Sequence, residues 1–160
     1  MPALSANIRK LLGRTNLIVL PEDFFVVELP VDVKPIPGEW YRPATTRFAV
    51  FIREPNVVTL IVGRKKWLRM QHIFEKYKVR GPVKVVEFDV KLSMASRGYM
   101  AAIGTLLAES QLSAVPVSSF LRDHIIVPKA DLPRTVRIIR QFLESCRSGK
   151  NKSSAQGGKA

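Results

Sequence analysis

The sequence predicts an α+β fold in which a strand-rich first half is followed by one β-α-β-β-α unit. Two short apolar runs, AVPVSSF and HIIVP, flank a polar turn at 121–123 and give way to an amphipathic helix. Upstream, an apolar run and a second helix complete the unit over residues 83–146. Short β-branched runs are typical of strands, and apolar residues at helical spacing are typical of a helix that covers a sheet.

Residues 1–15 are expected to form an N-terminal extension. Residues 1–14 contain no acid and carry Arg9, Lys10 and Arg14 among leucines and isoleucine, which is weakly similar to a transit peptide. A frayed first helix explains the same composition equally well, so both interpretations stay open.

The strands expected next belong to a degenerate N-terminal module over residues 16–82. LIVL at 17–20 and FFVVEL at 24–29 flank a Pro-Glu-Asp turn, and FAVFI at 48–52 forms a hairpin with VVTLIV at 57–62. A loop around Trp40 and Tyr41 is expected between these pairs, since four prolines exclude a long helix there: Pro30, Pro35, Pro37 and Pro43.

A helix is expected from Arg64 to about Lys78. One of its faces carries apolar side chains that we interpret as core: Trp67, Met70, Phe74 and Tyr77. The opposite face carries basic side chains at intervals of four, three and four residues: Lys65, Arg69, His72 and Lys76. This stripe is either a solvated helix face or a surface that binds the phosphates of a polyanion.

A strand over 83–90 leads, through a loop of small residues, to a helix that Ser96 opens and that ends near Glu109. A stripe of small side chains follows the length of this helix: Ala101, Gly104 and Ala108. Because glycine inside a helix costs about 1 kcal/mol relative to alanine, the stripe indicates that another backbone passes close by.

The last helix is expected to begin at Leu132. Asp131 is a suitable N-cap, since its carboxylate can accept hydrogen bonds from free amides, and Pro133 lies where no amide hydrogen is needed. Apolar residues recur at helical spacing as far as Leu143. No strand follows this helix, so we expect the segment 16–29 to supply a fourth strand to the C-terminal sheet.

The net charge is +13, and ten of these positive charges lie in residues 64–91 and 147–160. Such a charge makes contact with polyanions easy. Residues 147–160 are polar and are expected to form a disordered tail. The single cysteine, Cys146, excludes a disulfide framework, and no apolar run approaches the roughly 20 residues that a membrane helix needs. We therefore expect a cytoplasmic protein without membrane contact.

The chain carries none of the usual signatures of an enzyme or of a metal site. Ser119, Asp123 and His124 come without a nucleophile elbow or a glycine-rich oxyanion loop. Two histidines and one cysteine far apart do not make a metal ligand set, and GRKKW at 63–67 lacks the spacing of a phosphate-binding loop. We expect no catalysis, no metal and no cofactor.

Several short stretches form a pattern over residues 98–143: LLAESQLS at 106–113, VSSF at 117–120, Asp123, IIV at 125–127 and ADL at 130–132. This pattern resembles the small double-ACT proteins, which are related to the ACT modules of aspartate kinase and to the animal cytosolic arginine sensors. Residues 16–77 resemble the family in topology only. The resemblance implies two ferredoxin-like ACT modules of βαββαβ type, over 16–82 and 83–146, with strand exchange between them.

Three residues differ from the family pattern. Gln111 stands where the family prefers a glycine that ends the helix, Arg122 replaces a small polar residue, and His124 replaces an aromatic. The last two flank the ligand pocket that the resemblance implies.

The resemblance also implies that the protein binds a free amino acid between a helix start and a strand bend. Carried onto this chain, the ligand contacts are Ser96, Gly98 and Tyr99 at the helix start, and four residues at the bend: Ser118, Ser119, Phe120 and Asp123. Free N–H groups would bind the ligand carboxylate, Phe120 would wall the side-chain pocket, and Asp123 would pair with an ammonium group. In the alternative, Ser96 only caps the helix and Asp123 is a turn residue paired with Arg122 or Arg134.

Two functions therefore stay open. The first is a regulatory, homodimeric protein whose amino-acid ligand stabilises one arrangement of modules or subunits. The second is an RNA- or ribosome-associated protein that presents the basic stripe (Lys65, Arg69, His72 and Lys76) and the tail to phosphates.

Overall fold

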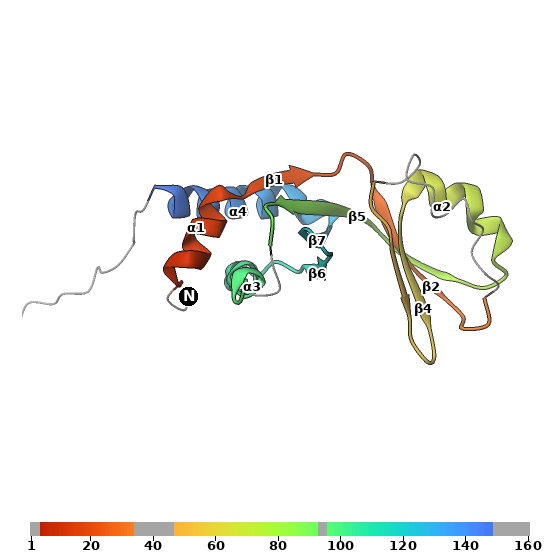
Figure 1. Ribbon diagram of the computed structural model, residues 1–160. Helices are drawn as coiled ribbons and strands as arrows, with labels where there is room; N and C mark the ends of the chain where they lie inside the picture. The colour runs from red at the N-terminus through yellow and green to blue at the C-terminus, as the bar shows by residue number, and fades with distance from the viewer. Residues whose placement is uncertain (1–3, 34–46, 93–95, 149–160) are drawn as a thin grey trace, which may run out of the picture.

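One curved antiparallel sheet of seven strands organises the computed structural model, which describes residues 4–33, 47–92 and 96–148 (Figure 1). The strands are β1 (Asn16–Val19), β2 (Phe24–Leu29), β3 (Val50–Arg53), β4 (Val58–Gly63), β5 (Lys78–Asp89), β6 (Val115–Ser118) and β7 (Asp123–Pro128). The helices are α1 (Ala6–Arg14), α2 (Arg64–Met70), α3 (Tyr99–Glu109) and α4 (Leu132–Arg147), with 3₁₀ turns at Gln71–Ile73 and Lys129–Asp131. None of these helices is long and apolar enough to cross a membrane.

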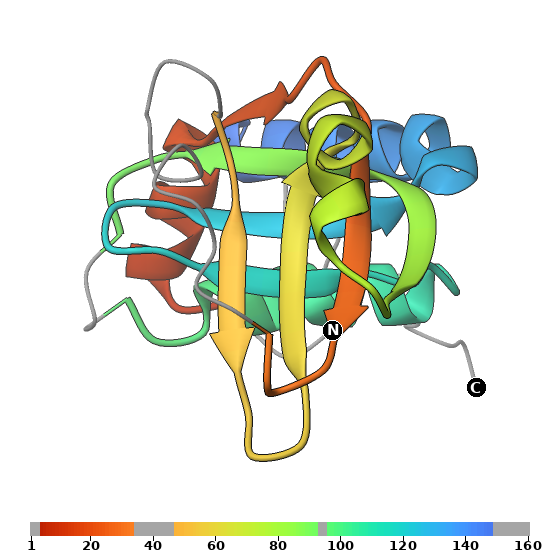
Figure 2. The ribbon, with the colours of Figure 1, turned by 90° about the vertical axis from the view of Figure 1, so that its right-hand side faces the viewer.

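β5 is 12 residues long and belongs to both halves of the sheet. The strand order is β3-β4-β2-β5-β7-β6, and β1 also pairs with β5. The first part of β5 pairs with β2 and completes the N-terminal half, with β3 and β4. Its second part pairs with β7 on one side and with β1 on the other, and β6 completes this C-terminal half. Figure 2 shows β2, β3 and β4 running across the face of β5, β7 and β6, so the sheet folds over itself into two layers.

Three groups of buried side chains hold these layers together. α1, α3 and α4 cover one face of the C-terminal half, where Leu12 and Phe88 are fully buried. The N-terminal half covers the other face, around Phe24. α2 closes the outer face of the N-terminal half, where the rings of Trp67 and Phe74 stack at a centroid distance of 5.6 Å. Each fully buried large apolar side chain contributes about 1.5–3 kcal/mol, so both faces of the C-terminal half are held by packing.

The N-terminal segment is a packed helix. Ser5 caps α1 by accepting a hydrogen bond from the Ile8 amide at 3.3 Å. Ile8 and Leu12 are buried in the core that α4 also covers. At the end of α4, Arg147 donates to the Thr15 carbonyl at 2.6 Å. The expectation of a frayed first helix is therefore wrong for α1.

The helix expected from Arg64 to Lys78 ends at Met70. A 3₁₀ turn follows, the backbone is extended at Phe74 (φ −108°, ψ 122°), and β5 begins at Lys78. The cause is tertiary, because Lys78 pairs with Glu28 of β2 and their side chains form an ion pair at 2.9 Å. Pairing with β2 overrides the helical spacing of the sequence.

The apolar face predicted for that helix is confirmed in part. Trp67 and Phe74 are buried, and Met70 is partly buried against them. Tyr77 is 42% exposed, although its ring meets that of Trp67 edge-on at 5.0 Å. The core under α2 is therefore built from both the helix and the turn that follows it.

α3 begins later than predicted, whereas α4 begins at Leu132 as predicted but without the predicted side-chain cap. α3 begins at Tyr99, because Gly98 before it has a left-handed backbone with φ of +91°. Asp131 precedes α4, but its carboxylate makes no capping hydrogen bond, since the preceding 3₁₀ turn holds its backbone in a helical conformation. Two predictions lie outside the described residues: the loop around Trp40 and Tyr41, and the tail after residue 148.

Candidate functional site

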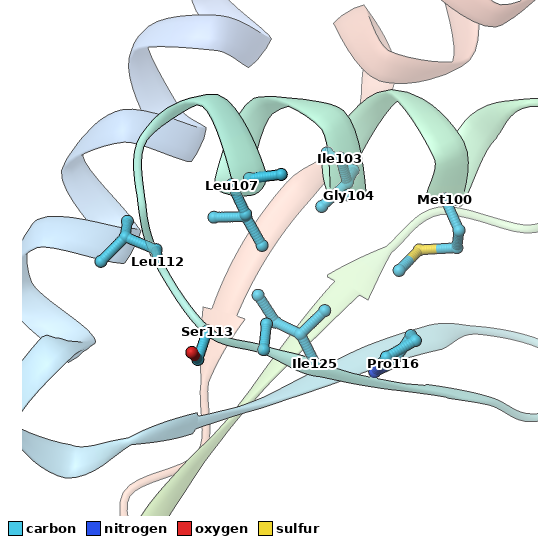
Figure 3. Close-up of a pocket in the computed structure, with 10 residues that line it drawn as sticks. Met100, Ile103, Gly104, Leu107, Leu112, Ser113, Pro116 and Ile125 are labelled. Carbon is cyan, nitrogen blue, oxygen red and sulfur yellow. The ribbon is translucent and has the colours of Figure 1, made fainter.

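An apolar groove lies between α3 and the edge strand β6 (Figure 3). Its volume is about 330 Å³, at the lower end of the range for small-molecule sites. In Figure 3, Met100 points from α3 toward Pro116 of β6. The lining is apolar apart from one serine: Met100, Ile103, Gly104, Leu107, Ala108, Leu112, Ser113, Ala114, Pro116 and Ile125.

The small residues of α3 lie beside this groove and face solvent. Gly104 lines the groove, and a Cβ atom added there would meet no atom within 4 Å. Ala101 and Ala108 are exposed. The sequence predicted that another backbone packs against these small residues, and no backbone in the described part of this chain does so. The stripe leaves an open helix face beside β6, where Val115 is 59% exposed.

A carboxylate and a hydroxyl lie at one end of the groove. Asp123 on β7 pairs with Ser118 on β6, and two positions along the strands Ile125 pairs with Pro116. Directly opposite residues of an antiparallel pair share a face of the sheet, and so do residues two apart. Asp123 and Ser118 therefore lie on the same face as Ile125 and Pro116, which line the groove.

Asp123 is partly buried, and its carboxylate forms no ion pair with any residue that the structure describes. The two basic residues that the sequence suggested as its partners, Arg122 and Arg134, form no ion pair with it. Arg122 pairs with two carboxylates of β5, and Arg134 donates to the carbonyl of Ser110 at 2.9 Å. A partly buried carboxylate without a counter-ion favours a bound cation, because its charge is incompletely solvated.

Tyr99 lies in the core beneath the start of α3. Its side chain is 1% exposed, and its hydroxyl is hydrogen-bonded to Thr15 at 2.8 Å. Burial raises the pKa of Tyr99 above its ordinary value, and the negative charge on Asp123 raises it further. Tyr99 therefore supports α3 from below and presents no surface to a ligand.

The other residues predicted at the helix start are at the surface. Gly98 is exposed, and the space beside its Cα is open. The carbonyl of Ser96 accepts a long hydrogen bond of 3.5 Å from the Tyr99 amide. The backbone at the start of α3 is therefore accessible from the side of Gly98.

At the strand bend, Ser119 is used by the turn itself. Its hydroxyl donates to the Arg122 carbonyl at 2.7 Å. Phe120 is 97% exposed and Leu121 is 51% exposed, so Phe120 walls no pocket within a single chain. A wall built from Phe120 requires a second molecule.

Sequence reasoning missed a charged cluster on the opposite face of the sheet. Arg122 Nε lies 2.9 Å from Asp89 Oδ1 and 3.3 Å from Glu87 Oε1, and His124 Nε2 lies 3.5 Å from Glu87 Oε2. The His124 ring also packs against Phe48 at a centroid distance of 4.9 Å. The alternation of Glu87 and Asp89 along one strand is the signal that could have located this cluster. Within the described ranges, no group of three or more His, Cys, Asp or Glu side chains could hold a metal ion.

The four residues of the basic stripe do not share one helix face. α2 ends at Met70, so His72 lies in the 3₁₀ turn that follows it and Lys76 lies in the bend before β5. All four are exposed at the end of the molecule that α2 forms (Figure 1): Lys65, Arg69, His72 and Lys76. Leu68 and Ile73, which are 47% and 45% exposed, lie among them.

Neither a protein-family model nor a curated protein matches the chain. Several solved structures are similar to it. A protein of unknown function from Vibrio cholerae, described as a possible transport protein, has a TM-score of 0.61 and 20% identity, over 85% of this chain and 95% of that one. The ligand-free regulatory subunit of aspartate kinase from Thermus thermophilus has a TM-score of 0.58 and 13% identity, over 79% of this chain and 97% of that one. The Thermus flavus regulatory subunit has a TM-score of 0.60 and 11% identity, over 79% and 96%.

At these identities the likeness shows the fold alone. It agrees with the ACT-like fold that the sequence resemblance implies. The chain has a mixed α+β fold with a curved antiparallel sheet, similar to that of the regulatory subunits of aspartate kinase.

Proposed function

We propose that this protein is a non-catalytic regulator that binds a free amino acid. The likeness to regulatory subunits of aspartate kinase supports a regulatory role. We also propose that it consists of two ACT-like modules, over 16–82 and 83–146, which share β5. In this arrangement β1 comes from the N-terminal module and serves as the fourth strand of the C-terminal one. Residues 1–15 and 147–160 flank the two modules.

The single observation that carries the proposal is the partly buried Asp123 carboxylate, which has no counter-ion among the described residues. The ammonium group of an amino acid supplies that counter-ion. The hydroxyl of Ser118, on the neighbouring strand, offers a further hydrogen bond. Hydrogen bonds between charged groups are roughly twice as strong as neutral ones, so this contact would dominate recognition of the ligand backbone.

The ligand carboxylate would bind at the start of α3. The first N–H groups of a helix have no partner within the helix, and the helix dipole is positive there. Gly98 leaves space for a ligand to approach this backbone, and Ser96 lies just before it. The carboxylate and the ammonium of one small molecule would thus connect α3 with β7.

A second copy of the chain would complete the site. Apolar side chains are exposed at β6 and at its turn: Val115, Phe120 and Leu121. In a homodimer with two-fold symmetry, the most common oligomer, these side chains would be covered and Phe120 would wall a ligand pocket. The ligand could then regulate a partner only through its different affinity for two arrangements of the subunits.

The test is thermal unfolding against all twenty amino acids at millimolar concentration, in moderate salt. A ligand present at 100 times its dissociation constant adds about 2.7 kcal/mol, which raises the Tm by several degrees for a chain of this size. Asp123→Asn keeps the shape of the side chain and should abolish the shift. Asp131→Asn, at the start of α4, is the matched control and should keep it. A shift that survives in Asp123→Asn would refute this site.

A second candidate function rests on the exposed basic end of the molecule. Lys65, Arg69, His72 and Lys76 are all exposed there and could contact the phosphates of RNA. Replacing Lys65, Arg69 and Lys76 by alanine should weaken RNA binding and flatten its salt dependence. Replacing Arg137 and Arg140, exposed on α4, is the control of similar charge. Equal effects of both sets would indicate unspecific attraction.

A further inference from the structure

The chemistry of the groove between α3 and β6 restricts which amino acid can bind. We propose that the ligand is a free amino acid with an apolar side chain of about the size of leucine or methionine, and that this side chain occupies the groove. The inference rests on the proposed function, since Asp123 is taken as the partner of the ligand ammonium. It adds the identity of the side chain, which Asp123 alone does not determine.

The geometry follows from the strand register. The pair of Asp123 and Ser118 lies two residues from the pair of Ile125 and Pro116 on the same face of β7 and β6. Two residues along a strand correspond to about 7 Å. That separation is comparable to the length of a leucine or methionine molecule. A ligand with its ammonium at Asp123 would therefore place its side chain between α3 and the Ile125–Pro116 pair.

The lining of the groove selects against polar side chains. No ionisable residue lines it, and its only side-chain hydroxyl belongs to Ser113, at the end where α3 turns toward β6. A buried charged or amide group without partners costs several kcal/mol. An apolar side chain gains instead, because Met100, Ile103 and Ile125 would surround it.

Gly104 provides the means to close the groove without disturbing the core. It lies on the solvent side of α3, and an added Cβ meets no atom within 4 Å. Leucine at this position would extend into the groove and would also favour the helix, since glycine is about 1 kcal/mol worse than good helix formers. Gly104→Leu should therefore fold at least as stably as the unchanged protein.

The experiment measures binding of leucine, methionine, lysine, glutamate and glycine by calorimetry to the full chain. Leucine or methionine should bind at least about tenfold more tightly than the other three. Glycine lacks the methylenes, each of which is worth about 10–200-fold in an apolar pocket, and the charge of lysine or glutamate would have no partner in the groove. Gly104→Leu should weaken leucine binding about tenfold or more, with its Tm unchanged or raised. Gly104→Ala, which adds one methyl group and the same helix preference, is the control and should bind leucine nearly as before.

Failure of this inference is distinct from failure of the proposed function. If lysine or glutamate binds most tightly and Asp123→Asn abolishes that binding, the proposed function stands and the apolar ligand is wrong. If no amino acid binds, both are wrong. If Gly104→Leu binds leucine with unchanged affinity, the groove is not the pocket.

Discussion

The hydroxyl pair that joins the end of α1 to α3 allows a prediction with a defined sign. Thr15 Oγ1 lies 2.9 Å from the Leu11 carbonyl oxygen and 2.8 Å from the Tyr99 hydroxyl oxygen. Thr15 and Tyr99 are 0% and 1% exposed. A threonine hydroxyl has one hydrogen, and a carbonyl can only accept. Thr15 therefore donates to Leu11, and the Tyr99 hydroxyl donates to Thr15.

Because of this direction, Tyr99→Phe and Thr15→Val should lower the free energy of unfolding by different amounts. Tyr99→Phe removes one hydrogen bond and leaves Thr15 its bond to Leu11, at a cost of about 0.5–1.5 kcal/mol. Thr15→Val leaves the Tyr99 hydroxyl as a buried donor without a partner, at a cost of about 1–3 kcal/mol. The double substitution should cost less than the sum of the two, because the orphaned donor is then removed as well.

Urea unfolding with matched m values measures the three free energies. Tyr77→Phe removes a phenol that is 42% exposed and is the control, with an expected change below about 0.5 kcal/mol. If Tyr99→Phe costs more than Thr15→Val, the assigned direction of the hydrogen bond is wrong.

The same tyrosine should make the unfolding free energy depend on alkaline pH. Burial is the main cause that raises the pKa of Tyr99 above its ordinary value of 10.0. The folded protein therefore keeps this proton when the unfolded chain has lost it. The stability that the neutral phenol contributes is complete below pH 10.0 and is lost as the pH rises beyond it. Tyr99→Phe should remove this part of the alkaline slope.

Three further predictions concern single groups. Gln111 follows α3 with a left-handed φ of +53°, so Gln111→Gly should stabilise the protein by about 1 kcal/mol, and a lowered Tm would contradict this reading of the helix end. Lys129 and Lys84 hold the pKa of Asp23 below 3.8, so its contribution is complete above that pH and is lost on further acidification. Asp23→Asn should therefore reduce the fall of Tm at acidic pH. If the Tm of the variant and of the unchanged protein fall equally with pH, the ion pairs of Asp23 do not contribute to stability. Burial raises the pKa of the Cys146 thiol, so a thiol reagent at pH 8 should label the native protein far more slowly than the unfolded chain, and equal rates would show that the thiol is accessible.

The strands at the N-terminus show how far local pattern reaches. The runs at 17–20 and 24–29 are strands, and the turn between them was visible in the sequence. The sequence also predicted that this segment adds a strand to the C-terminal sheet, but not that its two strands separate and pair with β5 in different halves of the sheet. The buried Lys84 ammonium fixes this crossing by donating to the carbonyls of Pro21 and Glu22 at 2.7 and 2.9 Å. A lysine more than sixty residues away leaves no local signal.

The candidate site was predictable only where polar residues occur at a bend. Asp123 could be singled out because an acid between two apolar runs needs a partner. The groove could not be predicted, since Met100, Ile103 and Pro116 are apolar residues that a sequence does not distinguish from residues of the core. The sequence indicates the groove only through Gly104. Glycine destabilises a helix interior, so its presence there suggested a structural role, and Gly104 lines the groove with open space beside its Cα.

The first elements of the C-terminal half to be synthesised need partners that are synthesised much later. α1 and β1 leave the ribosome before their partners, because β1 pairs with Val86–Asp89, and Arg147 in the last turn of α4 donates to the Thr15 carbonyl, 132 residues earlier in the chain. Contacts of such long range form slowly, and until then the apolar side of α1 has no cover. A nascent chain that stops before β5 would expose an unpaired β1, and one that stops before α4 would expose Leu12; both are features that lead to aggregation. Synthesis of α4, more than the folding of any one earlier segment, should therefore be the step after which the apolar side of α1 is protected from misassembly.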